Sequence, residues 1–214
     1  MNIDAEFRLF VKHIHSDLNY LAHILLSYPD NDEMLGNFLG DFVRKKDMLI
    51  LPESIQVGVN LHRVIDQYTD RHDSVKSSVE ILKPKVGRYA WVAIDIINDH
   101  FLCQQWEDYS PISLREFCDH FYFLLKRKKK ILPSNLNQQV DIMIDHDFLM
   151  NTYNHHRLYK TMKHMERRTS FKSNFTDSIP ILKEKEEEFQ TNFKVLFDDL
   201  VTLCQKEEEK TNAE

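Results

Sequence analysis

The stretch YAWVAIDIINDHFLCQQW, residues 89–106, decides the fold class of this chain. From Tyr89 to Leu102 it is apolar almost throughout. The polar exceptions are Asp95, Asn98, Asp99 and His100. An apolar run of this length predicts a helix that is buried over much of its surface.

The composition extends this prediction to the whole chain. Its 214 residues include only 4 glycines and 6 prolines, whereas sandwiches, barrels and glycine-rich phosphate loops need many tight turns. Hydrophobic residues make up 42% of the sequence and charged residues 29%, which permits a core and argues against disorder. We therefore expect one all-α domain, a helical bundle of about eight to ten helices without strands.

The helices are expected between proline and glycine interruptions. Pro29, Pro84 with Gly87, and Pro133 mark expected ends, and Pro180 marks an expected beginning. The expected helices cover about 4–15, 18–28, 31–46, 52–72, 74–83, 87–108, 113–131, 135–150, 153–170 and 180–206. We interpret 18–206 as the helical domain, 1–17 as an N-terminal extension and 207–214 as a polar tail.

The distribution of charge indicates which partners to expect, and the cysteines indicate the cellular compartment. The net charge is −6, but Lys183–Glu214 holds ten acidic and five basic residues, while the rest holds 24 acidic and 23 basic. A nearly neutral body does not demand nucleic acid but permits an acidic partner at one face. Basic runs occur at 44–46, 126–130 and 167–168. Three widely spaced cysteines, no signal peptide and no apolar run near the roughly 20 residues of a membrane span predict a cytoplasmic protein.

Polar residues four apart recur on otherwise apolar helices in the first half of the chain. Residues at this spacing share one helix face. The set comprises Asn19 with His23, Asn37 with Asp41, His62 with Asp66 and Asp70, and Asp95 with Asp99, next to His100. An isolated buried carboxylate costs several kcal/mol, so these groups need a cation, a metal or hydrogen-bond donors. Converging His, Asp and Asn side chains favour Mn²⁺, Mg²⁺ or Fe²⁺ over a structural zinc site.

Plainer explanations remain open for each residue taken singly. His23 is compatible with a hydrogen-bonded core histidine, Asp41 with an ion pair to Arg44, and Gly36 and Gly40 with close helix packing. The basic run at 126–130 suits a solvated helix end, and Cys103 suits a buried thiol. The alternative is therefore a non-catalytic helical binding module, in which the polar pairs are hydrogen bonds of helix packing.

Four of these segments together resemble the acyl carrier protein phosphodiesterase family. They are LNYLAH (18–23), GNFLGDFV (36–43), HRVIDQYTDRH (62–72) and DIINDHFLCQQW (95–106). The resemblance implies an all-helical enzyme related to the HD phosphohydrolases, with Mn²⁺ preferred. Such an enzyme removes the 4′-phosphopantetheine arm from holo acyl carrier protein, a strongly acidic protein of lipid metabolism.

By this resemblance the family's recurrent polar residues are Asn19, His23, Asn37, Asp41, His62, Asp66, Asp70, Asp95, Asp99 and His100. We hypothesise that one or two divalent ions bind at Asp41, His62, Asp66 and Asp99, and that His23 or His100 protonates the leaving serine oxygen. Arg44 and Arg63 are expected to bind the phosphate, and Asn19, Asn37, Asp70 and Asp95 to support the site. The standard HD order is absent here, since the chain has His62-x-x-x-Asp66 and the reversed doublet Asp99-His100. A related phosphohydrolase that acts on a nucleotide or another small phosphodiester is the alternative.

One expectation concerns the start of the chain. Members of this family usually begin at the equivalent of Leu18, whereas 17 residues precede it here. We hypothesise that translation begins at codon 18, which N-terminal mass determination on native protein would test. Oligomeric state is not predicted by any feature of the sequence.

Overall fold

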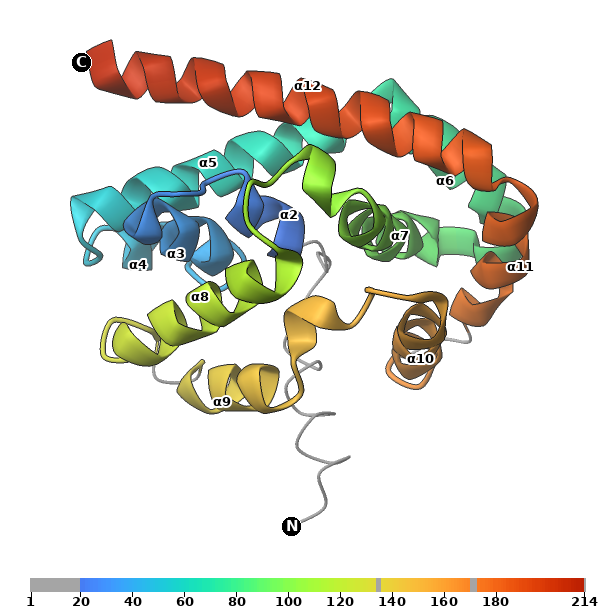
Figure 1. Ribbon diagram of the computed structural model, residues 1–214, viewed down its shortest axis with the longest axis horizontal. Helices are drawn as coiled ribbons and strands as arrows, with labels where there is room; N and C mark the ends of the chain where they lie inside the picture. The colour runs from blue at the N-terminus through green and yellow to red at the C-terminus, as the bar shows by residue number, and fades with distance from the viewer. Residues whose placement is uncertain (1–19, 134–135, 170–172, 214) are drawn as a thin grey trace.

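The computed structural model describes residues 20–133, 136–169 and 173–213, and every regular element in these ranges is a helix (Figure 1). The α-helices are α2 (Tyr20–Leu25), α3 (Asn31–Leu39), α4 (Lys45–Met48), α5 (Glu53–Thr69), α6 (Asp73–Val86), α7 (Ala90–Gln104), α8 (Leu114–Arg127), α9 (Asn137–Asp145), α10 (His155–Glu166), α11 (Ser178–Glu184) and α12 (Glu186–Ala213). Short 3₁₀ turns lie at Gly87–Tyr89, Trp106–Asp108, Phe148–Met150 and Phe175–Asp177. The all-α prediction is confirmed.

Helix α7 is buried over much of its surface, as its apolar sequence predicts, and it is the central element of the fold. It contacts α2, α6, α10 and α12, and it lies in the middle of the molecule in Figure 1. Its buried apolar residues, among them Ile94, Ile97 and Phe101, belong to one continuous core. The long helix α12 crosses one side of the bundle and buries Phe189, Phe193 and other large residues against this core. Burial of a phenylalanine side chain contributes about 1.5–3 kcal/mol.

Helices α3 and α5 approach each other through two glycines. A Cβ atom at Gly36 would lie 2.1 Å from the carbonyl oxygen of Ile55, and one at Gly58 would lie 2.1 Å from that of Glu33. No residue with a side chain fits at either position without moving backbone. The close approach brings Asn37 and the residues after α3 against the middle of α5.

Several helix ends differ from the sequence prediction. Asp30 caps α3 by accepting hydrogen bonds from the amides of Asp32 and Glu33, as expected, but α3 ends at Leu39 rather than near residue 46. The chain then turns beside α5, where a Cβ atom at Gly40 would lie 2.1 Å from the His62 ring. The turn directs the segment after α3 toward α5 and leaves α4 as a separate short helix.

Pro84 does not end its helix, because it lies in the last turn of α6. The break follows at Gly87, whose φ of 68° lies in the left-handed region that glycine adopts at little cost. The final helical segment is also divided: α11 includes Pro180 in its first turn, and α12 begins after Lys185. Helix α12 continues to Ala213, beyond the expected end near residue 206.

Two further expectations have different outcomes. The helix predicted at 4–15 lies outside the described residues, as does the extension 1–17. Within the described ranges, no helix is both long and apolar enough to cross a membrane.

Candidate metal centre

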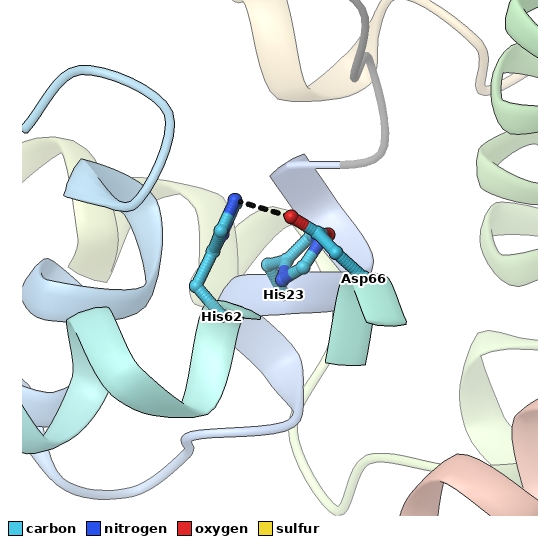
Figure 2. A group of neighbouring side chains, drawn as sticks. All are labelled: His23, His62 and Asp66. Atoms are coloured by element: carbon cyan, nitrogen blue, oxygen red, sulfur yellow. Dashed lines mark ion pairs between the residues drawn. The ribbon is translucent and has the colours of Figure 1, made fainter. Parts of the chain in front are cut away.

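Two helices bring two histidines and a carboxylate together. His23 comes from α2, and His62 and Asp66 lie one turn apart on α5 (Figure 2). One ligand atom from each of the three residues lies within 4.8 Å of the others. The carboxylate bridges the two rings, with Oδ1 3.2 Å from His23 Nε2 and Oδ2 3.1 Å from His62 Nε2. The imidazole rings stack with centroids 4.1 Å apart.

Asn37 fixes the orientation and the tautomer of His23. Its Nδ2 donates to the carbonyl oxygen of His23 and to Ser27 Oγ, each at 2.8 Å, so its Oδ1 is an acceptor. That Oδ1 lies 2.8 Å from His23 Nδ1, which therefore carries the proton. His23 Nε2 is then the ring nitrogen that faces Asp66, and it ligates a metal when it is deprotonated. A second partner that holds one ring nitrogen of a ligating histidine is a recurrent feature of metal sites.

Ser27 was missed by the sequence interpretation. It is buried, and it lies in the turn after α2, four residues after His23. The same spacing of four that singled out Asn19 and His23 would have included it. Serine is among the commonest residues in turns, so a serine at this position does not by itself predict a buried polar contact.

Asp41 completes the cluster from the turn after α3. Its Oδ1 lies 3.3 Å from His62 Nε2, so His62 contacts two carboxylates. Burial of His62 disfavours the imidazolium, but hydrogen bonds and charges from Asp41 and Asp66 outweigh it and raise the pKa of His62 to about 10. Burial opposes ionisation of Asp66 too, yet the hydrogen bonds and charges of His23 and His62 hold its pKa well below the usual range.

The cluster contains buried polar atoms that lack hydrogen-bond partners. These atoms, in the part of the chain that the structure describes, include His23 Nε2, Asp41 Oδ2 and His62 Nδ1. His23 Nε2 faces Asp66 Oδ1 at 3.2 Å, and the two groups form an ion pair when Nε2 is protonated. When Nε2 is deprotonated, a divalent cation between the imidazole and the carboxylate satisfies both. Nitrogen and oxygen ligands at about 2.1 Å from one ion are about 3.0–3.4 Å apart, which matches these separations and fits a divalent metal.

The side that opens to solvent is formed by Asp66. Its side chain is 31% exposed, whereas that of Asp41 is 13% exposed and that of His62 is 2% exposed. A ligand from solution therefore reaches the carboxylate first, and the two histidines form the closed wall behind it. This arrangement is typical of a catalytic metal site, which keeps one side open, rather than of a closed structural site.

Asp99, the fourth ligand in our prediction, is not in this cluster. It is buried on α7, and burial raises the pKa of its carboxyl well above the usual range, while the backbone amides of Leu21 and Ala22 oppose this. The Asp99 carboxyl thus lies against the first turn of α2, at the amides of the two residues that precede His23. Its Oδ1 atom has no hydrogen-bond partner within the described residues. A role for Asp99 as a ligand stays a prediction.

The other predicted site residues lie outside the group of three. His100 Nδ1 donates to the carbonyl oxygen of Thr152 at 2.6 Å, and burial lowers the pKa of His100. Arg44 is exposed and pairs with Asp47 rather than with Asp41. Arg63 contacts Met48, and Asp70 caps the end of α5. Asp95 is half-buried on α7. Asn19 lies outside the described residues.

Comparison with known proteins agrees with the resemblance seen in the sequence. The sequence model of the family "Acyl carrier protein phosphodiesterase" matches residues 18–200. A relative from Shigella boydii serotype 18, named acyl carrier protein phosphodiesterase, is 32% identical over 150 residues, which cover 64% of this chain and 76% of the relative. Relatives of the same name from Enterobacter sp. and Klebsiella pneumoniae subsp. pneumoniae are 37% and 38% identical over 101 residues.

These last two alignments cover 47% of this chain and 52% of each relative, so the chain spans about half the length of those relatives. No solved structure matches the chain. The expected relation to the HD phosphohydrolases therefore stays a prediction. Because the family model covers most of the chain and includes every residue of the cluster, the chain belongs to the acyl carrier protein phosphodiesterase family.

Proposed function

We propose that this protein hydrolyses the phosphodiester that joins 4′-phosphopantetheine to the serine of holo acyl carrier protein. One observation carries the proposal: within the segment that matches the family, α2 and α5 bring His23, His62 and Asp66 into one open cluster. Relatives from Shigella, Enterobacter and Klebsiella are named for this reaction. We infer that the reaction takes place in the cytoplasm, and that neither nucleic acid nor membrane takes part.

The donor set suggests which ion the site would hold. His23, His62, Asp66 and Asp41 offer two imidazoles and two carboxylates, and the described part of the chain places no cysteine with them. Nitrogen and oxygen ligands of this kind suit Mn²⁺, with Mg²⁺ or Fe²⁺ as alternatives. When bound, the ion supplies Lewis acidity toward water and toward the phosphodiester oxygens.

The proposed reaction is a hydrolysis at phosphorus in which residues of the site orient the reactants. Water attacks phosphorus, the bond from phosphorus to the serine oxygen breaks, and that oxygen takes a proton, which yields the apo carrier protein and 4′-phosphopantetheine. Asp66 is the exposed carboxylate that faces the attacking water, and Asn37 holds His23 in place behind it. Arg63 and Arg44 remain our candidates for contact with the phosphate. His100 is less suited to donate the proton than the sequence predicted, because its Nδ1 proton is given to the Thr152 carbonyl and burial lowers its pKa.

The role of His23 changes relative to the sequence prediction. With its Nδ1 held by Asn37 and its Nε2 facing Asp66, His23 is suited to bind the metal through Nε2. Asp99 is suited to hold the first turn of α2, and thereby His23, through the amides of Leu21 and Ala22. Of our predicted catalytic residues, His23 is thus proposed as a metal ligand and Asp99 as a positioning residue.

Mass spectrometry of holo acyl carrier protein tests the proposal. The substrate is incubated with the purified protein in the presence of Mn²⁺ or of EDTA. We expect the carrier protein to lose the mass of phosphopantetheine only when the metal is present. An unchanged mass under every divalent metal, together with turnover of a small phosphodiester, would contradict the proposed substrate and favour the alternative phosphohydrolase.

A further inference from the structure

A solvent-facing segment lies directly beside the candidate metal centre. Residues 44–50, RKKDMLI, connect the turn that carries Asp41 to the start of α5, and we call them the 44–50 segment. Helix α4 within it buries none of its residues. Leu49 is 73% exposed and Ile50 is 84% exposed, more than any other large hydrophobic residue in the described part of the chain. An adjacent pair of such side chains next to three cations is unusual on a free surface and indicates a contact site.

The segment also presents cations without internal partners. Arg44 pairs with Asp47 at 2.7 Å, whereas Lys45 and Lys46 are exposed and form no ion pair with any described residue. Their charges are therefore available to an acidic partner. The segment carries three basic residues and one acidic residue, so it is a local positive surface on a chain whose net charge is −6.

The other long basic run is used differently. In residues 126–130, Lys128 pairs with Asp32 at 2.7 Å and Lys129 pairs with Asp141 at 2.6 Å. The guanidinium of Arg127 lies 5.6 Å from the centroid of the exposed Phe123 ring. Lys128 and Lys129 are therefore bound within the molecule, whereas Lys126 and Lys130 are exposed, as expected of a solvated helix end.

Position separates the two runs as well. Lys128 contacts Asp32 at the beginning of α3, whereas the metal centre lies past the end of that helix, at Asp41. The 44–50 segment, in contrast, begins three residues after Asp41. Its Met48 Sδ atom accepts a contact of 3.4 Å from Arg63, the residue that follows His62. A macromolecule bound to this segment would lie at the edge of the cluster.

We propose that the 44–50 segment is the surface on which the acidic carrier protein docks. Lys45 and Lys46 pair with carboxylates of the carrier protein, and Leu49 and Ile50 pack against apolar side chains that lie among those carboxylates. The proposal rests on the proposed function for the identity of the partner. Charge complementarity guides the encounter, and the apolar pair supplies contact area that salt does not screen.

Binding of apo acyl carrier protein tests this surface separately from catalysis. The apo form lacks the phosphopantetheine arm, so its affinity reports protein contacts alone. For Lys45→Glu with Lys46→Glu we expect the dissociation constant to rise by about 10- to 100-fold at low salt, with a weaker dependence on ionic strength. For Leu49→Ser with Ile50→Ser we expect a rise of about tenfold and an unchanged dependence on ionic strength.

The matched control is Lys126→Glu with Lys130→Glu, which changes the net charge by the same amount on the other basic run. We expect this variant to bind within about twofold of the unaltered protein. With holo carrier protein as substrate, the variants of the 44–50 segment should raise KM at unchanged kcat, because none of the four residues touches the cluster.

Two outcomes would overturn the docking surface. If the two lysine variants lost the same affinity, the loss would be an effect of net charge and not of the 44–50 segment. If neither variant of the 44–50 segment changed the affinity, the segment would not be the docking surface. Failure of the proposed function is distinguishable from both. In that case the unaltered protein binds apo carrier protein through the 44–50 segment but does not hydrolyse the holo form with any metal.

Discussion

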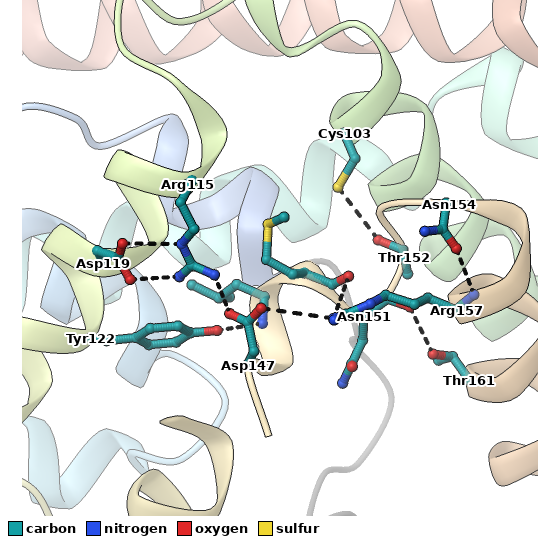
Figure 3. Close-up of polar contacts among 12 residues, drawn as sticks. Cys103, Arg115, Asp119, Tyr122, Asp147, Asn151, Thr152, Asn154, Arg157 and Thr161 are labelled. Atoms are coloured by element: carbon teal, nitrogen blue, oxygen red, sulfur yellow. Dashed lines mark hydrogen bonds and ion pairs between the residues drawn. The ribbon is translucent and has the colours of Figure 1, made fainter. Parts of the chain in front are cut away.

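Two polar clusters of this molecule differ in how completely their groups are satisfied. In the cluster around Asp147, Arg115 donates to Asp147 at 2.8 Å and pairs through two nitrogens with Asp119, and Arg157 approaches Asp147 at 3.8 Å (Figure 3). Tyr122 accepts a hydrogen bond from the amide of Leu149 nearby. In the metal-centre cluster, buried atoms of His23, Asp41 and His62 have no partner within the described residues.

The difference separates a structural network from a binding site. The Asp147 cluster ties α8, the turn at Phe148–Met150 and α10 together, and its charges neutralise one another. An unsatisfied buried polar atom costs about 1–3 kcal/mol, so several in one place are retained only where a ligand completes them.

Replacement of Asp66 by alanine should give the largest change. We expect kcat/KM for holo carrier protein to fall on the order of a thousandfold, because the bridging carboxylate is lost. Circular dichroism should show an unchanged helical content, since Asp66 is partly exposed and contributes little to the core. Activity within tenfold of the unaltered protein would reject the cluster as the catalytic centre.

Metal should stabilise the protein through the same cluster. At a Mn²⁺ concentration 100-fold above the dissociation constant, the free energy of unfolding should rise by about 2.7 kcal/mol, and EDTA should reverse this. Thermal unfolding measures the effect. The Asp66→Ala protein should show no such increase, whereas a protein altered in the Asp147 cluster should show all of it. An equal increase in both variants would place the metal elsewhere.

Asn37 should act through His23 rather than by touching metal. In Asn37→Ala the hydrogen bond to His23 Nδ1 is lost, so we expect the affinity for Mn²⁺ to fall by about 10- to 100-fold. Titration calorimetry gives this value directly. Asn37 also contacts Ser27, so Ser27→Ala serves as the comparison, with a smaller loss. If Asn37→Ala lowered stability but left metal affinity intact, its role would be purely structural.

Asp147→Ala should have the smallest effect and the opposite pattern. The change removes an ion pair between partly exposed groups and leaves alanine at a φ of 51°, so we expect a loss of about 1–2 kcal/mol in the free energy of unfolding. Chemical denaturation measures it, and Asp147→Asn should recover part of the loss, because asparagine tolerates the left-handed conformation. Activity should stay within about twofold, since none of the Asp147 contacts reaches the metal-centre cluster.

Much of the fold was predictable because it depends on local pattern. The apolar run at 89–106 identified α7 as a buried helix. Ser113 caps α8 with Glu116 in a full capping box, at the start expected from Pro111 and Ser113. The errors lie at positions where tertiary contact outweighs local preference. The helix after Asp30 ends at Leu39 because the chain turns there against the His62 ring, which no property of residues 31–46 reveals.

The same division applies to the site. The spacing of four residues identified His23, Asn37, Asp41, His62 and Asp66 as members of shared polar faces. It also identified Asp99, Asp70 and Asp95, which lie on helix faces just as regular but outside the group of three. Helical spacing fixes which side chains share a face, and it carries no information on which faces of different helices meet.

The all-α class, the buried helix at 89–106, the polar faces of the helices and the family can all be read from the amino-acid sequence. These properties follow from composition, from periodicity of 3.6 residues and from motif order, all of which are local along the chain. The meeting of His23 from α2 with His62 and Asp66 from α5, beside the 44–50 segment, is a property of the folded molecule alone. That meeting depends on the contact at Gly36 and Gly58, where the absence of side chains lets the backbones of α3 and α5 touch.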